Sequence, residues 1–164
     1  VLGGDEGIGH GHRYALSALE LGRINVASRS VGVAQAAFEA AMRYAQQRET
    51  FGRPIFEHQA IQFKLAEMAT KLQAARLMTY DAARRADAGE RVDMEAGMAK
   101  LFASEAAFEI ATDALRIHGG NGYTTEFPVE RYFRDTPLMI IGEGTSEIQK
   151  MVIARKLLER YPLE

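Results

Sequence analysis

The amino-acid sequence predicts an all-α fold, an up-down four-helix bundle, from three observations. Apolar residues recur at helical spacing over long stretches, for example at Ile61, Leu65 and Met68. Glycine, proline and capping residues divide the chain into a few long segments. No stretch of appreciable length alternates apolar and polar residues with the period of two that marks a strand. We therefore expect three long helices and a fourth, shorter one.

The first predicted helix follows a glycine-rich opening. Residues 1–12 lack an initiator Met and a targeting pattern, and we interpret them as the tail of a preceding domain plus a linker. Residues 13–164 then form one helical-bundle domain, whose first helix runs from about residue 15 to 48. This helix is rich in small residues, which favour close helix packing at the centre of a bundle: Gly22, Ala27, Ser30, Gly32, Ala34, Ala37 and Ala41. Pro54 follows it and disfavours helix at the preceding residue.

Two more long helices follow. The second, residues 57–87, carries the apolar stripe Ile61, Leu65, Met68, Leu72 and Ala75. The third, residues 93–117, has Asp93 as a candidate N-cap and ends at a glycine-rich segment that suits a left-handed C-cap. Its expected buried face is Met98, Leu101, Phe102, Phe108 and Leu115. A short helix, residues 128–134, and a capped helix, residues 146–160, complete the chain.

The composition is typical of one globular domain. The 164 residues are 47% apolar and 26% charged, with a formal net charge of −2. This charge gives no footprint for nucleic acid or an anionic membrane surface, and no run approaches the ~20 apolar residues of a membrane span. The absence of cysteine excludes disulfides and thiolate chemistry and fits a reducing compartment. The four histidines lack the spacing of a metal site, so we predict no metal.

The most informative segment precedes the last helix. Glu143 lies between Gly142 and Gly144, and the pair Ser146 and Gln149 fits a capping box at the helix start. The carboxylate therefore lies on an open turn next to a helix N-terminus, where N–H groups favour anionic partners. From these residues alone, a general base and a surface carboxylate in a glycine-rich cap are equally good interpretations.

Four motifs in order resemble one known family. The chain is similar throughout residues 1–164 to the C-terminal helical domain of the acyl-CoA dehydrogenases, in the motifs Arg48-Glu49-Thr50-Phe51-Gly52-Arg53-Pro54-Ile55, His58-Gln59, Ile117-His118-Gly119-Gly120-Asn121-Gly122-Tyr123 and Glu143-Gly144-Thr145-Ser146. The resemblance implies an N-terminal helical domain, a middle β domain that ends within residues 1–12, and this bundle. It also implies FAD between the β domain and the bundle, with each site completed by a neighbouring subunit of a tetramer or dimer.

The resemblance further implies a reaction and a role for each matching residue. The glutamate that matches Glu143 removes the pro-R α-proton of an acyl-CoA thioester while a hydride passes from the β-carbon to FAD, which yields the trans-2-enoyl-CoA. Glu20, Arg23 and Gly144 match substrate-side positions. The positions that match FAD contacts are Arg48, Thr50, Phe51, His58, Gln59, Arg116, Gly119, Gly120, Thr145, Ser146 and Glu147. Electron-transfer flavoprotein is the implied acceptor, and the implied location is the cytoplasm, or the mitochondrial matrix in a eukaryote.

Three positions depart from the common family pattern. Gly22 stands where some branches carry the base, so the base would come from the loop glutamate alone. Arg116 replaces a frequent Gln and could reach a phosphate or pair with Asp113 or Glu109. Gly142 replaces a frequent Tyr and leaves room for a branched or polar acyl group.

Two other functions remain open at this point. An acyl-CoA oxidase-like flavoprotein would use O2 to reoxidise the flavin, because acceptor choice depends on access to the flavin. A non-catalytic helical assembly domain would keep the motifs as relics. In either enzyme, two of the three implied domains lie outside this chain, so we expect the chain alone to be inactive.

Overall fold

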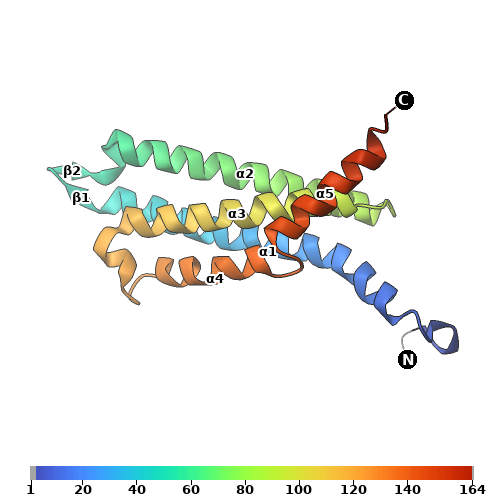
Figure 1. The fold of residues 1–164 in the computed structure, drawn as a ribbon. Coiled ribbons are helices and arrows are strands. Elements are labelled where there is room, and N and C mark those ends of the chain that lie inside the picture. Colours follow the sequence, from blue (N-terminus) through green and yellow to red (C-terminus); the bar gives the residue numbers. More distant parts are fainter. Residues whose placement is uncertain (1–2, 164) are drawn as a thin grey trace.

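The chain folds into an up-down bundle of four helices with a fifth helix attached. The computed structural model describes residues 3–163 (Figure 1). The helices are α1 (Gly11–Gln47), α2 (Gln59–Asp87), α3 (Asp93–His118), α4 (Val129–Ile141) and α5 (Ser146–Arg160). Successive helices α1 to α4 run in alternating directions, and α5 crosses α3 and projects from the bundle (Figure 1). The predicted fold class is confirmed.

Short elements connect the helices. They are three 3-10 turns, η1 (Asp5–Gly7), η2 (Ile55–Glu57) and η3 (Gly119–Tyr123), and one antiparallel hairpin of β1 (Glu49–Thr50) and β2 (Arg53–Pro54). α1 begins at Gly11, earlier than predicted, and the division between residues 1–12 and 13–164 stays a prediction, with residues 1–2 outside the described part. Within residues 3–163, no helix is both long and apolar enough to cross a membrane.

Small side chains hold the centre of the bundle together. On α1, the predicted small residues Ala27, Ala34, Ala37 and Ala41 are at most 1% exposed, whereas Gly32 is exposed. α1 packs against α2, α3 and α4, as expected for a central helix. The predicted stripe of α2 is also confirmed: Leu65, Met68, Leu72 and Ala75 are buried, and Ile61 is half-buried.

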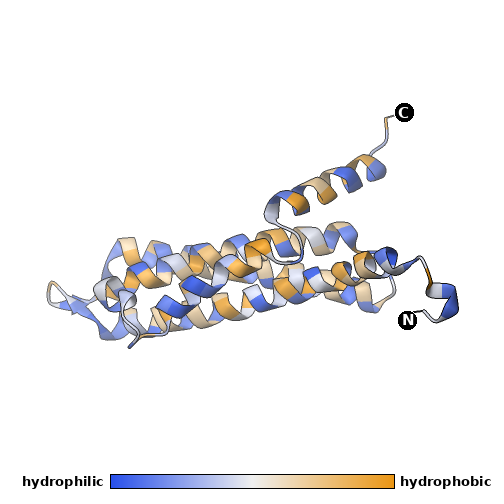
Figure 2. Cartoon of the chain, turned by 60° about the horizontal axis from the view of Figure 1, so that its bottom comes forward, coloured by the Kyte–Doolittle hydropathy of each residue, from blue (hydrophilic) through white to orange (hydrophobic). Residues whose placement is uncertain are grey.

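The predicted buried face of α3 is wrong. Phe102 is 36% exposed, and Met98, Leu101, Phe108 and Leu115 are only half-buried. The buried face is mostly small residues, Ala96, Ala99, Ala103, Ala107, Ala111 and Ala114, with the larger Ile110 and Ile117 towards its end. A methyl side chain lets α1 and α3 approach each other closely, so alanine occupies most of this contact. Apolar residues also recur along α5, outside the bundle (Figure 2).

α4 is longer than the predicted helix, which ended at residue 134. It continues through Pro137 to Ile141. Proline has no N–H to donate to the carbonyl four residues earlier, which belongs to Phe133. The buried hydroxyl of Thr136 donates to this oxygen instead, at 3.1 Å. The substitution of one donor for another explains how α4 passes its proline and serves as the fourth helix of the bundle.

The start of α3 differs by one residue from the prediction. Val92 is the N-cap, and Asp93 is the first helical residue. Asp93 pairs with Arg91 at 3.0 Å rather than capping the helix. The backbone N–H of Val92 donates to Oε1 of Glu20 at 2.8 Å, so a side chain from α1 holds the beginning of α3.

Candidate active site

The predicted site residues form two groups at different places along α1. The first group surrounds the turn between α4 and α5, which meets α1 at Gly22. The second group lies at the other end of α1, around Arg48 and the hairpin (Figure 1). The helical stretch from Gly22 to Arg48 is roughly 39 Å long at about 1.5 Å per residue. One copy of the chain therefore does not bring the two groups together.

The carboxylate of Glu143 lies directly against α1. A Cβ placed on Gly22 would be 2.7 Å from Oε2 and 2.8 Å from Cδ of Glu143. Both distances are shorter than real Cβ contacts, so a side chain at this position would displace the carboxylate from its place. The glutamate side chain is half-buried as a result.

The backbone of Glu143 is strained. Within residues 3–163, two non-glycine residues have positive φ, Glu143 at 55° and Phe51 at 51°. Such conformations cost of order 1–3 kcal/mol and gather at functional sites. Both residues are among the predicted site residues, one in each group.

We call residues 142–145 the Glu143 turn. Gly144 has φ 90°, and a Cβ on it would lie 2.8 Å from Nε2 of Gln149, so this position also requires glycine. Thr145 is the N-cap of α5, and its Oγ1 accepts from the N–H of Ile148 at 3.4 Å. The turn is thus closed by a cap two residues after the glutamate.

The predicted capping box is wrong. Because Thr145 takes the cap, Ser146 is the first helical residue, and its hydroxyl donates to Glu105 Oε1 of α3 at 2.6 Å. The amide of Gln149 donates to the carbonyls of Glu143 and Gly144 at 2.9 and 3.0 Å. Glu147 is exposed, and hydrogen bonds from its own N–H and from the Thr145 hydroxyl lower the pKa of its carboxyl.

One residue of this site was not predicted. Lys100 of α3 is fully buried, and its Nζ donates to the carbonyls of Ile140 and Gly144 at 2.8 and 2.9 Å. No signal in the sequence marked it, because the alanine face of α3 on which it lies was itself not predicted.

The substrate-side candidates on α1 differ in their surroundings. Nε of Arg23 is buried and has no hydrogen-bond partner within residues 3–163. The carboxylate of Glu20 already accepts a hydrogen bond from the N–H of Val92, as described above.

The apolar residues next to the Glu143 turn are exposed to solvent in this chain: Leu138 is 67% and Ile141 62% exposed. An additional surface has to cover them if the glutamate is to work away from water.

The hairpin presents Phe51 at the other end of α1. The two-residue turn Phe51-Gly52 has positive φ at both positions, which matches the twist of a tight hairpin. The Phe51 ring is 97% exposed. Behind it, Nε2 of His58 lies 3.1 Å from the Thr50 hydroxyl, and Nδ1 lies 3.2 Å from a guanidinium nitrogen of Arg53. These contacts orient the hairpin towards the start of α2 at Gln59.

The end of α3 lies at the same end of the bundle. Gly119 caps α3 with φ 59°, and neither Gly119 nor Gly120 has a heavy atom near the place a Cβ would take. Their backbone is therefore open to close approach. Arg116 is 65% exposed at its side chain and lies 3.7 Å from Asp113, which also pairs with Lys64. The ion pair with Asp113 is one of the two expected arrangements of Arg116, and the phosphate contact stays a prediction.

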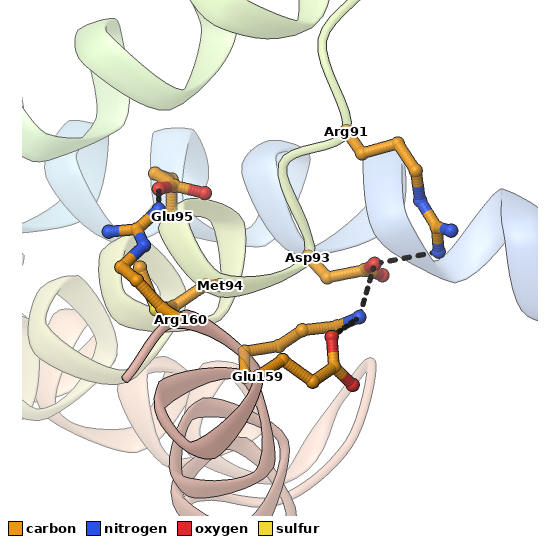
Figure 3. A pocket seen from close by; sticks show the side chains of 7 residues that line it. Arg91, Asp93, Met94, Glu95, Glu159 and Arg160 are labelled. Carbon is orange, nitrogen blue, oxygen red and sulfur yellow. Dashed lines mark hydrogen bonds and ion pairs between the residues drawn. The ribbon is translucent and has the colours of Figure 1, made fainter. Parts of the chain in front are cut away.

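A pocket of about 390 Å³ lies between α3 and α5 (Figure 3). Ion pairs within the chain account for the charged residues that line it. Its charged side chains pair with one another: Arg160 with Glu95 at 3.0 Å, Lys156 with Glu159 at 2.7 Å and with Asp93 at 3.8 Å, and Arg91 with Asp93 at 3.0 Å. These pairs attach α5 to the start of α3. No three His, Asp or Glu side chains of residues 3–163 are placed to hold a metal ion.

Comparison with known proteins gives consistent matches. The family model for the acyl-CoA dehydrogenase C-terminal domain matches residues 9–158. A 3-(aryl)acrylate reductase from Clostridium sporogenes is 54% identical over 145 residues, which is 88% of this chain and 38% of that protein. Subunit CarC of the caffeyl-CoA reductase-Etf complex from Acetobacterium woodii is 47% identical over 153 residues, 93% of this chain and 40% of that protein.

A solved structure agrees with these matches. Butyryl-CoA dehydrogenase from Megasphaera elsdenii superposes with a TM-score of 0.90 at 42% identity, over 92% of this chain and 39% of that chain. This chain therefore spans about two fifths of the length of the relatives that it matches.

Proposed function

Because the chain belongs to the acyl-CoA dehydrogenase family, as its C-terminal domain, we propose that Glu143 is the base of a flavoenzyme that converts acyl-CoA thioesters to trans-2-enoyl-CoA. The observation that supports this role best is the contact with Gly22. The backbone of this glutamate has a positive φ, and its carboxylate lies in the space that a side chain on Gly22 would need, which supports a dedicated place for a base.

The chemistry requires a positioned carboxylate. The α-proton of a thioester is weakly acidic, so the base must lie within hydrogen-bond reach of it in the bound substrate. Glu143 on its turn would accept this proton. We propose that the open apolar residues Leu138 and Ile141 are covered in the complete protein, which would exclude water from the carboxylate.

We propose FAD as the cofactor, because the hairpin end fits part of a flavin nucleotide. Arg48 offers a guanidinium to phosphate, Phe51 offers an exposed ring, and the bare backbone at Gly119 and Gly120 permits close approach. The chemistry that FAD supplies when bound is acceptance of the hydride from the substrate β-carbon. The distance between this end and Glu143 supports a shared site, in which a neighbouring copy supplies the hairpin end.

An electron acceptor and an assembly complete the proposal. The name of CarC places that relative in a complex with Etf, and we propose electron-transfer flavoprotein as the acceptor for this protein as well. We also propose a homo-oligomer, a tetramer or dimer, because each site would use two copies.

A second candidate is reduction in the reverse direction. Two of the relatives described above carry the name of a reductase, one for a 3-(aryl)acrylate and one for caffeyl-CoA. The same geometry would then serve a protonation: Glu143 would deliver the proton to the α-carbon, because a base in one direction is the acid in the other, and the β-carbon would receive the hydride from a bound reduced flavin. Gly142 does not open a space by itself, because a Cβ at this position would lie 3.2 Å from the carbonyl oxygen of Leu138, so the size of the substrate stays open.

The test is Glu143→Gln in the full-length protein. Glutamine keeps the shape and loses the base, so turnover in both directions should fall by ~10²–10⁴-fold while FAD stays bound. Glu67→Gln, an exposed change on α2, is the matched control and should behave like the wild type. Retention of more than about a tenth of the turnover by Glu143→Gln would exclude the proposed role. Oxygen consumption during turnover separates a dehydrogenase from an oxidase.

A further inference from the structure

We propose that Lys100 and Gln149 form a buried clamp that positions Glu143 for proton transfer. The proposal rests on the function proposed for Glu143 and adds two positioning residues to it. Neither residue needs to touch substrate or cofactor, because both act on the backbone of the Glu143 turn.

Lys100 connects the two sides of the turn. One of its hydrogen bonds goes to the carbonyl of Ile140, in the last turn of α4, where helix carbonyls lack intrahelical partners. The other goes to the carbonyl of Gly144, on the far side of Glu143. The ammonium group also lies at the negative end of the α4 dipole. The residues before and after the glutamate are therefore fixed to one point on α3.

Gln149 holds the same turn from α5. Its amide nitrogen donates to the carbonyl of Glu143 itself and to that of Gly144. The amide oxygen points the other way, near Gly97, and has no hydrogen-bond partner within residues 3–163. A flip of the amide would bring its oxygen against two carbonyls, so the two acceptors of the turn determine its orientation.

The buried polar groups of the clamp lower the stability of the fold compared with apolar side chains at the same positions. Lys100 is fully buried, and burial lowers the pKa of its amine, with Glu105 and Glu147 partly opposing the effect. Removal of a charge from water is costly, and an apolar side chain of similar volume is often as stabilising or more so. An unpaired amide oxygen on Gln149 adds to the cost. The clearest gain is a fixed conformation for Glu143, whose φ of 55° needs support from its surroundings.

Loss of the clamp would act on the chemical step. Displacement of a catalytic group by about 1 Å can slow a reaction by ~10²-fold. Without the hydrogen bonds from Lys100 and Gln149, the carboxylate of Glu143 could move away from Gly22, because a φ of 55° is unfavourable for a residue other than glycine.

The experiment compares Lys100→Met and Gln149→Leu in the full-length protein. Both replacements keep approximate volume and remove the hydrogen bonds to the turn. We expect single-turnover flavin reduction by acyl-CoA to slow by about tenfold or more in each variant. FAD content and the substrate concentration at half-saturation should stay within about twofold, and an α-deuterated substrate should still react more slowly than the unlabelled one.

A second readout does not depend on activity. Hydrogen exchange measured by mass spectrometry should become faster in the peptide that covers residues 140–149, and should stay unchanged in α2. Thr79→Val is the matched control, because it removes a buried hydrogen bond to the backbone of α2 and does not touch the turn. It should leave the reduction rate and the exchange near the turn unchanged.

The outcomes separate the two proposals. Wild-type reduction rates per bound flavin in both variants, or lower FAD content with an unchanged rate, would overturn the clamp even if Glu143→Gln is inactive. An active Glu143→Gln would overturn the proposed function itself. If Lys100→Met does not fold, Gln149→Leu decides the question by the same measurements, since it removes no charge.

Discussion

The carboxylate of Glu143 occupies the space that a side chain on Gly22 would need. A Cβ on Gly22 would come within 2.7 Å of Oε2. Gly22 is half-buried in the middle of a helix, where glycine is less favourable than alanine by roughly 0.5–1 kcal/mol. The contact therefore has a cost in the stability of α1, and this cost makes the relationship testable.

Gly22→Ala should lower activity without lowering stability. The added methyl group forces the carboxylate away, so we expect turnover to fall by about tenfold or more. The melting temperature should stay the same or rise, because alanine favours the helix. Gly32→Ala is the matched control on α1, where no atom lies near the added methyl, and it should raise stability with full activity. Equal turnover of the two variants would contradict the assignment of the contact.

Phe51→Gly and Arg48→Ala should both weaken FAD retention and should differ in stability. Phe51→Gly relieves a positive φ, so it should stabilise the fold by up to about 1 kcal/mol while it removes the exposed ring. Arg48→Ala removes a charge-assisted contact and should leave the melting temperature unchanged. Flavin content after dialysis and thermal unfolding of the apo-protein measure both effects, with Arg29→Ala as an exposed control on α1. Unchanged flavin content in both variants would count against this assignment.

His118→Phe should flatten the pH dependence of stability between about pH 7 and pH 5. Burial lowers the pKa of His118, whose ring stacks on Tyr44 at 4.1 Å between centroids and donates to the carbonyl of Ala114. Below the unfolded value of about 6.5, protons bind preferentially to the unfolded chain, so the free energy of unfolding falls as the pH falls.

The slope of this loss is at most about 1.4 kcal/mol per pH unit for one proton. Phenylalanine keeps the stacking and cannot bind a proton. Carboxyls with lowered pKa, such as those of Asp81 and Glu130, lose their contribution only at still lower pH. Urea unfolding at pH 7, 6 and 5 measures the effect. Parallel curves for the wild type and the variant would refute it.

The 164-residue chain alone should be folded, colourless and inactive. Four packed helices supply a core, whereas a flavin held on half of its site loses more freedom than a few contacts return. The chain should also self-associate, because large apolar side chains such as Leu138, Met151 and Leu158 are 67–75% exposed. A visible spectrum and light scattering on the purified chain test both expectations. A yellow, active preparation would show that the chain contains a complete site.

Sequence reasoning predicted the helices well where glycine and proline mark their ends. The end of α3 at Gly119 followed from such a signal, and the stripe of α2 followed from the helical spacing of its apolar residues. It failed for the core of α3, because it ranked side chains by size, whereas Ala107 and Ala111 are buried where the helices lie closest together. The end of α4 was also wrong: the predicted helix stopped at residue 134, whereas the hydroxyl of Thr136 replaces the donor that Pro137 lacks and the helix continues to Ile141.

The same limits apply to the site. Glu143 and Phe51 were found from motifs, and their unusual backbone became visible only in the structure. Lys100 was missed because a single lysine in a helix is expected at the surface, and its partners lie about forty positions further along the chain. Local patterns cannot show a contact of that kind.

One uninterrupted helix carries both the contact with the proposed base and the arginine next to the hairpin. An inserted or deleted residue between Gly22 and Arg48 would turn one end relative to the other by about 100° and shift it by ~1.5 Å. The helix would remain fully formed, yet the two groups of site residues would face different directions. The number of residues in α1 is thus itself a functional parameter, and a length change in this helix should be far more damaging than one in the loop between α2 and α3.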